Sequence, residues 1–329
     1  MKQIIKKILS EKEVIPIVKK EFPKMKEIKS IKKLNSSRKN SNNFLINTKY
    51  GKYVVRNFLH NIKSGEMEKI CKTLEYCNKN KIKVSKPIKT KKGKFVENKN
   101  NIYLVKYVSG KEFSGDRKEI IDLAENIAKL HIILSKIPKS YYFIKNNSKY
   151  KLLNKKELKK IKNLIQQKQN KDKYDKLIFD EIIFIENCLV KLNIIPNTKN
   201  KIKKQFIHSD LNPKNVIFNK GKVSAIIDFD SLRIGNVIDD IAQCSFRFAI
   251  FKSKSQVVIK RKILIFLEHY NNFNPIELNF NEYVLVILKI TLTKISFLIK
   301  QRYIHDSNLW INELKKFISF AKICQKLLQ

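Results

Sequence analysis

The chain has 329 residues, and its 70 Lys and Arg against 29 Asp and Glu give a formal net charge of +41. Hydrophobic residues make up 43% of it, which is enough for two domains to bury sizeable cores and excludes disorder as the global state. Its five cysteines include no C-x-x-C pair and are odd in number, so the sequence indicates neither a disulfide framework nor a zinc site.

The first predicted structure is a hairpin in the N-terminal part. Apolar residues Phe44–Ile46 and Tyr53–Val55 form two short runs around the turn residues Tyr50–Lys52, a pattern typical of paired strands. The second strand ends at Arg56. We expect a helix to follow over residues 66–77.

An apolar strand and a longer helix come next. The strand Tyr103–Val108 ends in a polar turn at Ser109–Gly110, where we expect the chain to pass between domains. Glu119–His131 carries apolar residues at the helical period, and we interpret His131 beside that face as a packing residue. We expect Lys139–Lys173, rich in Lys, Asn and Gln, to be the most flexible region, with helices joined by solvated turns.

The C-terminal part is predicted to be mostly helical. Apolar residues recur at three-to-four spacing in Leu177–Leu192 and from Val257 onward. Two lysines interrupt Tyr283–Lys300, so this stretch favours a buried helix, and we expect no membrane span. Lysines also break up Met1–Leu9, which is therefore no signal peptide, and we expect a cytoplasmic protein.

The most informative segment is 206–230. His208, Asp210 and Asn215 fit the pattern H-x-D-x-x-x-x-N, and Asp228 follows thirteen residues after the amide. A kinase catalytic loop and its metal-binding turn have this format. Phosphoryl transfer needs positioned groups and a metal that neutralises phosphate charge, and Mg²⁺ prefers oxygen ligands such as Asn215 and Asp228. Asp210 would orient the attacking hydroxyl and accept its proton, with His208 bracing the loop.

The surrounding residues favour this interpretation over an ordinary turn. Any one of these Asp or Asn residues alone would be read as a turn residue, because both types are favoured there. Apolar runs at 206–207, 216–218 and 223–227 predict strands that enter and leave the loop at the required positions. The combination therefore favours a catalytic site.

Segment 206–230 resembles the superfamily of aminoglycoside phosphotransferases, choline kinases and homoserine kinase-like proteins. Its loop commonly reads H-G-D-x-x-x-x-N and is followed by I-D-F/W-D/E, and here Ser209 stands where Gly is usual. The resemblance implies an α+β, two-lobed protein-kinase-like fold. Residues 1–108 would form a small N-lobe with an antiparallel sheet and a helix, covering the nucleotide. Residues 109–329 would form a mostly helical C-lobe with the catalytic loop, metal site and acceptor-binding helices.

Residues 40–56 resemble the nucleotide-covering hairpin of the homoserine kinase-like branch. The resemblance implies that Arg56 contacts the α- and β-phosphates of ATP and pairs with a Glu of the following helix. Arg suits that role because its guanidinium binds phosphate through two hydrogen bonds. Register along the helix favours Glu68, while Glu66 and Glu75 remain alternatives.

Two further segments extend the resemblance. Tyr103–Glu112 is similar to the hinge whose backbone would bind adenine, which places Tyr107 among the nucleotide-binding residues. Arg233–Ala242 is similar to the family's D-I-A segment, which implies that Asp240 is a helix cap or a brace of the catalytic loop.

The high positive charge invites a different function, the binding of nucleic acid. Only seven of the 70 basic residues are Arg, lysines occur in every segment, and no RNA-binding motif is present. We therefore attribute the charge to compositional drift on solvated faces and expect no specific nucleic-acid partner.

Two functions remain open. The first is an ATP- and Mg²⁺-dependent phosphotransferase acting on a hydroxyl of a small metabolite. The acceptor could be homoserine, another amino alcohol, a sugar, a hexosamine, choline or an aminoglycoside. The second is a catalytically weak, kinase-like regulatory protein that holds nucleic acid or a partner on its basic surface; the presence of all three site residues argues against it. The sequence does not indicate an oligomeric state.

Overall fold

A computed structural model describes the chain over residues 9–34, 41–58, 64–141, 143, 151–192, 204–308 and 310–329. Three expectations fall partly outside these ranges. They concern residues 1–8 of the lysine-interrupted N-terminal segment, the start of the nucleotide-covering segment at Asn40, and residues 142 and 144–150 of the stretch expected to be most flexible.

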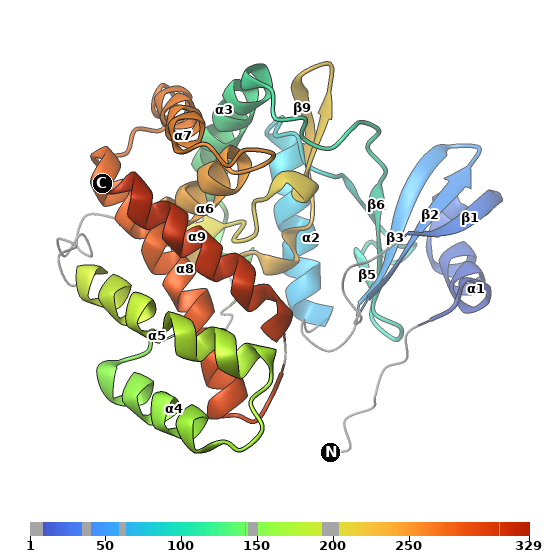
Figure 1. Ribbon diagram of the computed structural model, residues 1–329. Coiled ribbons are helices and arrows are strands. Elements are labelled where there is room, and N and C mark those ends of the chain that lie inside the picture. Colours follow the sequence, from blue (N-terminus) through green and yellow to red (C-terminus); the bar gives the residue numbers. More distant parts are fainter. Residues whose placement is uncertain are drawn as a thin grey trace.

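The smaller lobe contains an antiparallel sheet, seen at the right of Figure 1. Its strands run in the order β1-β2-β3-β6-β4, and β5 pairs with β6. They are β1 Ile28–Leu34, β2 Ser41–Thr48, β3 Gly51–Phe58, β4 Pro87–Ile88, β5 Val96–Glu97 and β6 Ile102–Lys106. The expected hairpin is confirmed: β2 and β3 pair from Ser41–Phe58 to Thr48–Gly51.

Successive side chains of a strand point to opposite faces of the sheet, and in this sheet both faces carry apolar side chains. In β6, Ile102 and Leu104 pack on one face with helix α1, Glu11–Glu21. Tyr103 and Val105 pack on the other face with helix α2, Ser64–Lys79, in a core that continues into the larger lobe. The sheet is thus held between two helices, and α2 connects the lobes.

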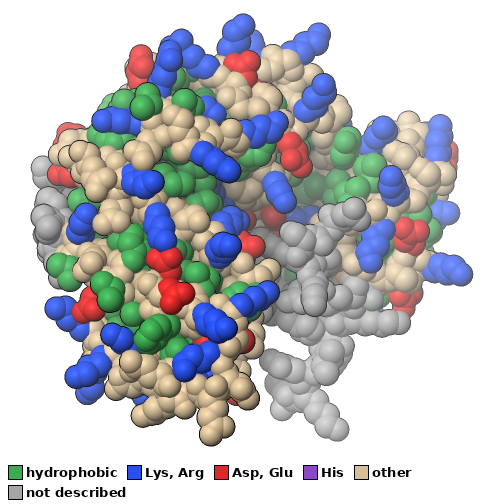
Figure 2. Space-filling model, in the orientation of Figure 1, with side chains coloured by type: hydrophobic (Ala, Val, Ile, Leu, Met, Phe, Trp, Pro, Cys, Tyr) green, Lys and Arg blue, Asp and Glu red, His purple; other side chains and the backbone are tan. Residues whose placement is uncertain are grey.

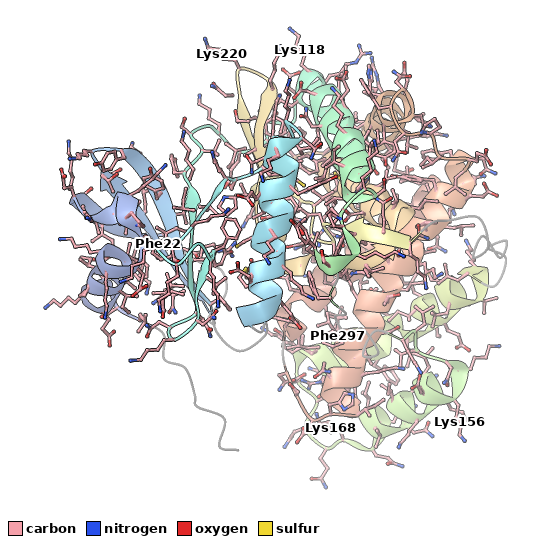
Figure 3. The ribbon with its side chains drawn as sticks, turned by 180° about the vertical axis from the view of Figure 1, so that it is seen from behind. Phe22, Lys118, Lys156, Lys168, Lys220 and Phe297 are labelled. Carbon is pink, nitrogen blue, oxygen red and sulfur yellow. The ribbon has the colours of Figure 1, made fainter. Side chains whose placement is uncertain are left out.

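The larger lobe is mostly helical. Its helices are α3 Arg117–Leu134, α4 Lys155–Gln167, α5 Lys173–Lys191, α6 Val237–Ala249, α7 Gln256–Asn271, α8 Phe280–Tyr303 and α9 Leu314–Leu327. Figures 1 and 3 show α3, α6 and α7 together at one end of the lobe and α4 and α5 at the other. The helices predicted from apolar spacing are confirmed. None of the described helices is both long and apolar enough to cross a bilayer.

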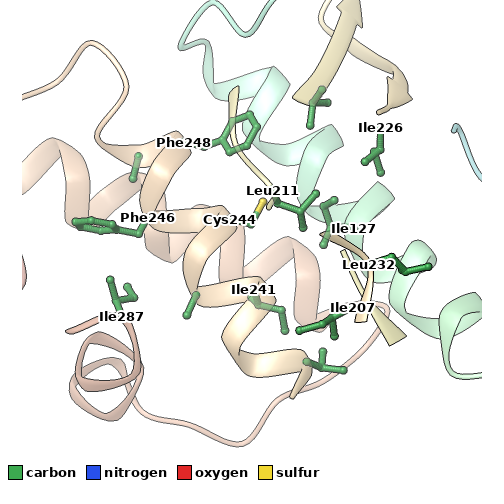
Figure 4. Packing of buried hydrophobic residues seen from close by; sticks show 14 of the residues in the cluster. Ile127, Ile207, Leu211, Ile226, Leu232, Ile241, Cys244, Phe246, Phe248 and Ile287 are labelled. Atoms are coloured by element: carbon green, nitrogen blue, oxygen red, sulfur yellow. The ribbon is translucent and has the colours of Figure 1, made fainter. Parts of the chain in front are cut away.

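Four short strands carry the chain through the middle of this lobe. β7 Lys204–Ile207 pairs with β10 Arg233–Asn236, and β8 Val216–Asn219 pairs with β9 Lys222–Ile226. Apolar side chains from the strands and from α3 and α6 pack beneath them, as Figure 4 shows for Ile207, Ile226, Ile127 and Ile241. The loops between the strands therefore rest on a rigid base.

Candidate active site

The site is built on the turns that connect these four strands. Asp210 follows β7, Asn215 ends the turn before β8, and Asp228 comes two residues after β9. The three strands predicted around the loop are confirmed. Leu211 anchors the first turn, since its side chain is buried among the core residues of Figure 4.

Hydrogen bonds join the two turns. Asn215 Nδ2 donates to the Asp210 carbonyl at 2.8 Å and lies 3.3 Å from Asp210 Oδ2. The Ile227 amide donates to the Asn215 carbonyl at 2.9 Å. Because Nδ2 is engaged with Asp210, the Asn215 side-chain oxygen is the atom suited to bind a metal. The Asp228 carboxylate is the other oxygen donor expected here, and donors of this hard type suit Mg²⁺.

Two residues of the site have left-handed backbone conformations. Ser209 has φ 69° and Asp228 has φ 64°. Such values are uncommon outside Gly and Asn and persist where the surroundings enforce them. At Ser209 those surroundings are Asp240, whose Oδ1 accepts the Ser209 amide at 2.7 Å, and Arg233, whose Nε donates to Ser209 Oγ. The carbonyl of Ser209 accepts Gln243 Nε2 at 2.9 Å.

Asp240 is buried behind the loop and binds it twice. Besides Ser209, it accepts the His208 amide at 2.8 Å and lies 3.2 Å from His131 Nε2. Burial by itself raises the pKa of Asp240, but His131 and the backbone of Ser209 outweigh it and lower the pKa. An ionised carboxylate thus holds the loop at neutral pH. Asp240 is not a helix cap, because Asn236 caps α6 by accepting the Ile238 amide.

The two predicted structural histidines are both buried and hydrogen-bonded. His208 Nε2 lies 2.9 Å from the Ile227 carbonyl and so links the loop to the turn that carries Asp228. His131 Nδ1 lies 2.9 Å from Tyr270 Oη, and its other nitrogen faces Asp240. His131 is thus buried on the apolar face of α3 as expected, and both of its nitrogens are engaged, one of them with Asp240.

Arg56 lies opposite the metal-binding turn. Its Nη2 donates to Asp230 Oδ2 at 2.8 Å and to Asp228 Oδ1 at 3.1 Å. Tyr103 Oη donates to the other oxygen of Asp230 at 3.1 Å. Burial by itself would lower the pKa of Arg56, but Asp230, Tyr103 and Asp228 raise it well above its ordinary value. The guanidinium therefore remains charged beside the expected metal site.

The expected pairing of Arg56 with Glu68 is wrong. Glu68 accepts the amides of Phe95 and Val96, each at 3.0 Å, and so ties α2 to the sheet. Glu75 pairs with Lys89 at 3.0 Å. Among the described residues, the acids on Arg56 are those of the I-D-F-D segment. Sequence spacing could not reveal this, because 172 residues separate Arg56 from Asp228.

Tyr107 lies just after β6, where the chain leaves the sheet. Its amide donates to the Lys52 carbonyl at 3.0 Å, so this group is engaged within the protein. A few residues later Gly110 crosses the end of β8, and a Cβ there would lie 2.4 Å from the Phe218 carbonyl oxygen. Position 110 therefore needs glycine, because two backbone segments approach each other closely there.

Three functional candidates on α6 and α8 escaped the sequence reasoning. Arg247 Nη1 pairs with Asp210 Oδ1 at 2.9 Å. Gln243 accepts Lys294 Nζ through its Oε1. Arg247 lies one helical turn after Gln243, so both face the loop from the same side of α6. That spacing was the available signal, but it becomes informative only once α6 is placed beneath the loop.

A shallow hollow adjoins this group between α6, α8 and α9. Its lining combines a polar edge next to the catalytic loop with an apolar wall. Figure 4 shows Phe246 of α6 and Ile287 of α8 beside each other in this wall. The lining residues are Gln243, Phe246, Arg247, Ile287, Ile290, Thr291, Lys294, Phe317 and Phe320.

Comparisons with known proteins agree with this geometry. Residues 30–259 match the model of the phosphotransferase enzyme family. No curated protein matches the chain in sequence.

Several solved structures share the fold. Spectinomycin phosphotransferase APH(9)-Ia, in complex with ADP and spectinomycin, has a TM-score of 0.68 at 14% identity, over 98% of this chain and 100% of that one. The amicoumacin kinase hAmiN, in complex with AMP-PNP, Ca²⁺ and amicoumacin, has a TM-score of 0.65 at 12% identity and covers 97% of this chain and 94% of its own. The choline kinase LicA from Streptococcus pneumoniae has a TM-score of 0.57 at 15% identity, over 95% of this chain and 98% of that one. The α+β, two-lobed kinase-like fold is confirmed, and the chain belongs to the phosphotransferase enzyme family.

Proposed function

We propose that the protein transfers the γ-phosphate of ATP to a hydroxyl group of a small molecule, with Mg²⁺ as the metal. The observation that carries the proposal is the convergence of Asp210, Asn215 and Asp228 on connected turns. Family membership and the nucleotide complexes of structures with the same fold support it.

Each residue has a distinct role in this proposal. Asp210 accepts a hydrogen bond from the acceptor hydroxyl, orients it toward the phosphorus atom and takes its proton. Arg247, paired with Asp210, keeps that carboxylate in position. The side-chain oxygens of Asn215 and Asp228 would hold Mg²⁺, which neutralises charge on the phosphates when bound. Arg56 would lie beside the phosphates, where its guanidinium offsets their charge.

The proposed domain division is compatible with the same function. We place the boundary between residues 108 and 109, just after β6 and before the Gly110 crossing. Nucleotide would then lie between the sheet and the catalytic turns, with Tyr107 at the hinge. Glu68 would act by holding α2 against the sheet rather than by touching phosphate.

The test is acceptor-dependent ATP consumption with Mg²⁺ by the wild type and Asp210→Asn. A general base typically raises the rate of the chemical step by 10²- to 10⁴-fold, so we expect kcat of the variant to fall by about that factor. The variant should still bind AMP-PNP. Asp180→Asn, an exposed acid of α5, is the matched control and should behave as wild type. Nucleotide binding without turnover on any acceptor, in wild type and variant alike, would instead favour the regulatory function.

A further inference from the structure

The hollow beside the catalytic loop carries positive charge. Arg247 and Lys294 are the charged residues among its described lining. Arg247 is paired with Asp210, whereas the described hydrogen-bond partner of Lys294 is the neutral Gln243, at 2.5 Å. Asp239, one turn before Gln243 on α6, is not part of the lining.

Lys294 is costly to keep charged in this position. Burial lowers its pKa well below the ordinary value, and Arg247 lowers it further, while Asp210 opposes the effect. Its ammonium also lies 5.3 Å from the centre of the Phe317 ring. A partly buried cation whose partners are a neutral amide and an aromatic ring lacks a counter-charge. An anion that binds to it therefore stabilises its charged form strongly.

Position links this cation to the chemistry. Gln243 accepts Lys294 on one side and donates to the Ser209 carbonyl, at 2.9 Å, on the other. The residue after Ser209 is Asp210. A group bound at Lys294 is therefore one amide side chain away from the catalytic loop, on the side where Arg247 reaches Asp210.

We propose that the acceptor is a hydroxy acid, whose anionic group binds Lys294 and whose hydrocarbon part lies on the apolar wall of Phe246, Ile287 and Phe317. The inference rests on the proposed function and names its substrate class. The ammonium of Lys294 would repel a cationic acceptor such as choline or an aminoglycoside, so the charge that attracts the acid selects against such cations.

The first experiment measures binding without nucleotide, so that it does not depend on catalysis. Thermal shifts and calorimetry in chloride buffer compare each acid with its neutral diol or triol: 3-phenyllactate with 3-phenylpropane-1,2-diol, and glycerate with glycerol. We expect at least one acid to bind at least tenfold more tightly than its neutral partner. Equal binding of acids and neutral partners would overturn the inference, as would tighter binding of choline.

The second experiment tests Lys294 itself. Loss of one charge-assisted hydrogen bond corresponds to roughly 10- to 100-fold in affinity, so Lys294→Met should raise Kd and KM for the acid by about that factor. Lys294→Arg should recover most of the loss, and Lys315→Met, an exposed lysine of α9, should change nothing. Unchanged acid binding by Lys294→Met would overturn the assignment.

Calorimetry with AMP-PNP and Mg²⁺ separates the two proposals. If all variants bind nucleotide, loss of turnover in Lys294→Met reports the acceptor site alone. If the wild type binds acid but no nucleotide, the proposed function fails while the anion site stands.

Discussion

Ser209 adopts a left-handed backbone conformation, φ 69°, next to the proposed catalytic base. Such a conformation costs a non-glycine residue about 1–2 kcal/mol. Its hydrogen bonds with Asp240, Gln243 and Arg233 offset that cost. The loop is therefore held in shape by its neighbours rather than by glycine flexibility.

Substitutions at Ser209 measure this balance. Ser209→Gly and Ser209→Val both lack the hydroxyl, so the difference between them reports the backbone conformation. We expect the unfolding free energy of Ser209→Gly to lie within about 1 kcal/mol of the wild-type value, and its activity to be kept. Glycine removes the strain of the left-handed backbone, and this gain offsets the lost hydrogen bond with Arg233. A β-branched residue is disfavoured at positive φ, so Ser209→Val should be about 2 kcal/mol less stable than Ser209→Gly. Urea denaturation checks both values, and equal stability would contradict the account.

At the same scale, local spacing predicted the loop residues but not their partners. The spacing of the H-x-D-x-x-x-x-N pattern and of the Asp that follows it singles out Asp210, Asn215 and Asp228, and the flanking strand patterns predict that all three occupy turns. Arg56 lies in β3 as expected, although that strand continues past the predicted end to Phe58, and its partners come from a turn far along the chain. Sequence periodicity contains no information on such pairing.

The packing of α5 against α8 depends on one buried carboxylate. Asp175 of α5 is 0% exposed and accepts hydrogen bonds from Lys168, Arg302 and Tyr303. Burial by itself raises the pKa of Asp175, but these partners lower it well below the ordinary value. Its ionised form is thus the one that stabilises the fold.

Asp175→Asn should therefore destabilise the protein in a pH-dependent way. Removing one partner of a buried charge cluster costs about 3–5 kcal/mol, and we expect a loss of that size near pH 7. Because the folded pKa is lower than the unfolded value of about 3.9, the contribution is complete above about pH 5 and falls as the pH drops further. Urea denaturation of both proteins from pH 7 to pH 3 should show the gap narrowing. A constant gap would contradict the ionised role.

The crossing of Gly110 over β8 gives a second test at this scale. A Cβ at Gly110 would meet backbone and the Ile217 side chain at 2.4–2.5 Å, so Gly110→Ala must displace the strand that follows Asn215. We expect a loss of about 1–3 kcal/mol in unfolding free energy and a lower kcat. Gly65→Ala is the control, because a Cβ added at this position of α2 would have no neighbour within 4 Å. Alanine there should raise the unfolding free energy by up to about 1 kcal/mol. A neutral Gly110→Ala would contradict the close approach.

Helices and strands were the most predictable level of this molecule. The spacing of apolar residues alone predicted helices at α3, α5 and α8, because each of these helices buries one side against the core. The hollow could not be predicted. It forms where α6, α8 and α9 meet, and its lining combines residues up to 77 positions apart, from Gln243 to Phe320.

At the scale of the molecule, the basic side chains of the residues that the structure describes are spread over both lobes rather than gathered in one patch. Figure 2 shows Lys and Arg over both lobes of the visible face. In Figure 3, Lys118 and Lys220 lie at one end of the molecule and Lys156 and Lys168 at the other. A dispersed lysine surface attracts polyanions without matching any particular shape.

This distribution predicts weak, salt-sensitive and sequence-independent binding of nucleic acid. Fluorescence anisotropy with duplex and single-stranded oligonucleotides of several sequences should give similar affinities at 50 mM NaCl. Counterion release should then reduce the affinity by about 10³-fold or more by 200 mM, if six or more phosphates are contacted. Lys294→Met should not change this binding, because one lysine among many contributes little to a dispersed surface. Binding that survives salt and distinguishes sequences would require a built nucleic-acid site, and would favour the regulatory function over the kinase.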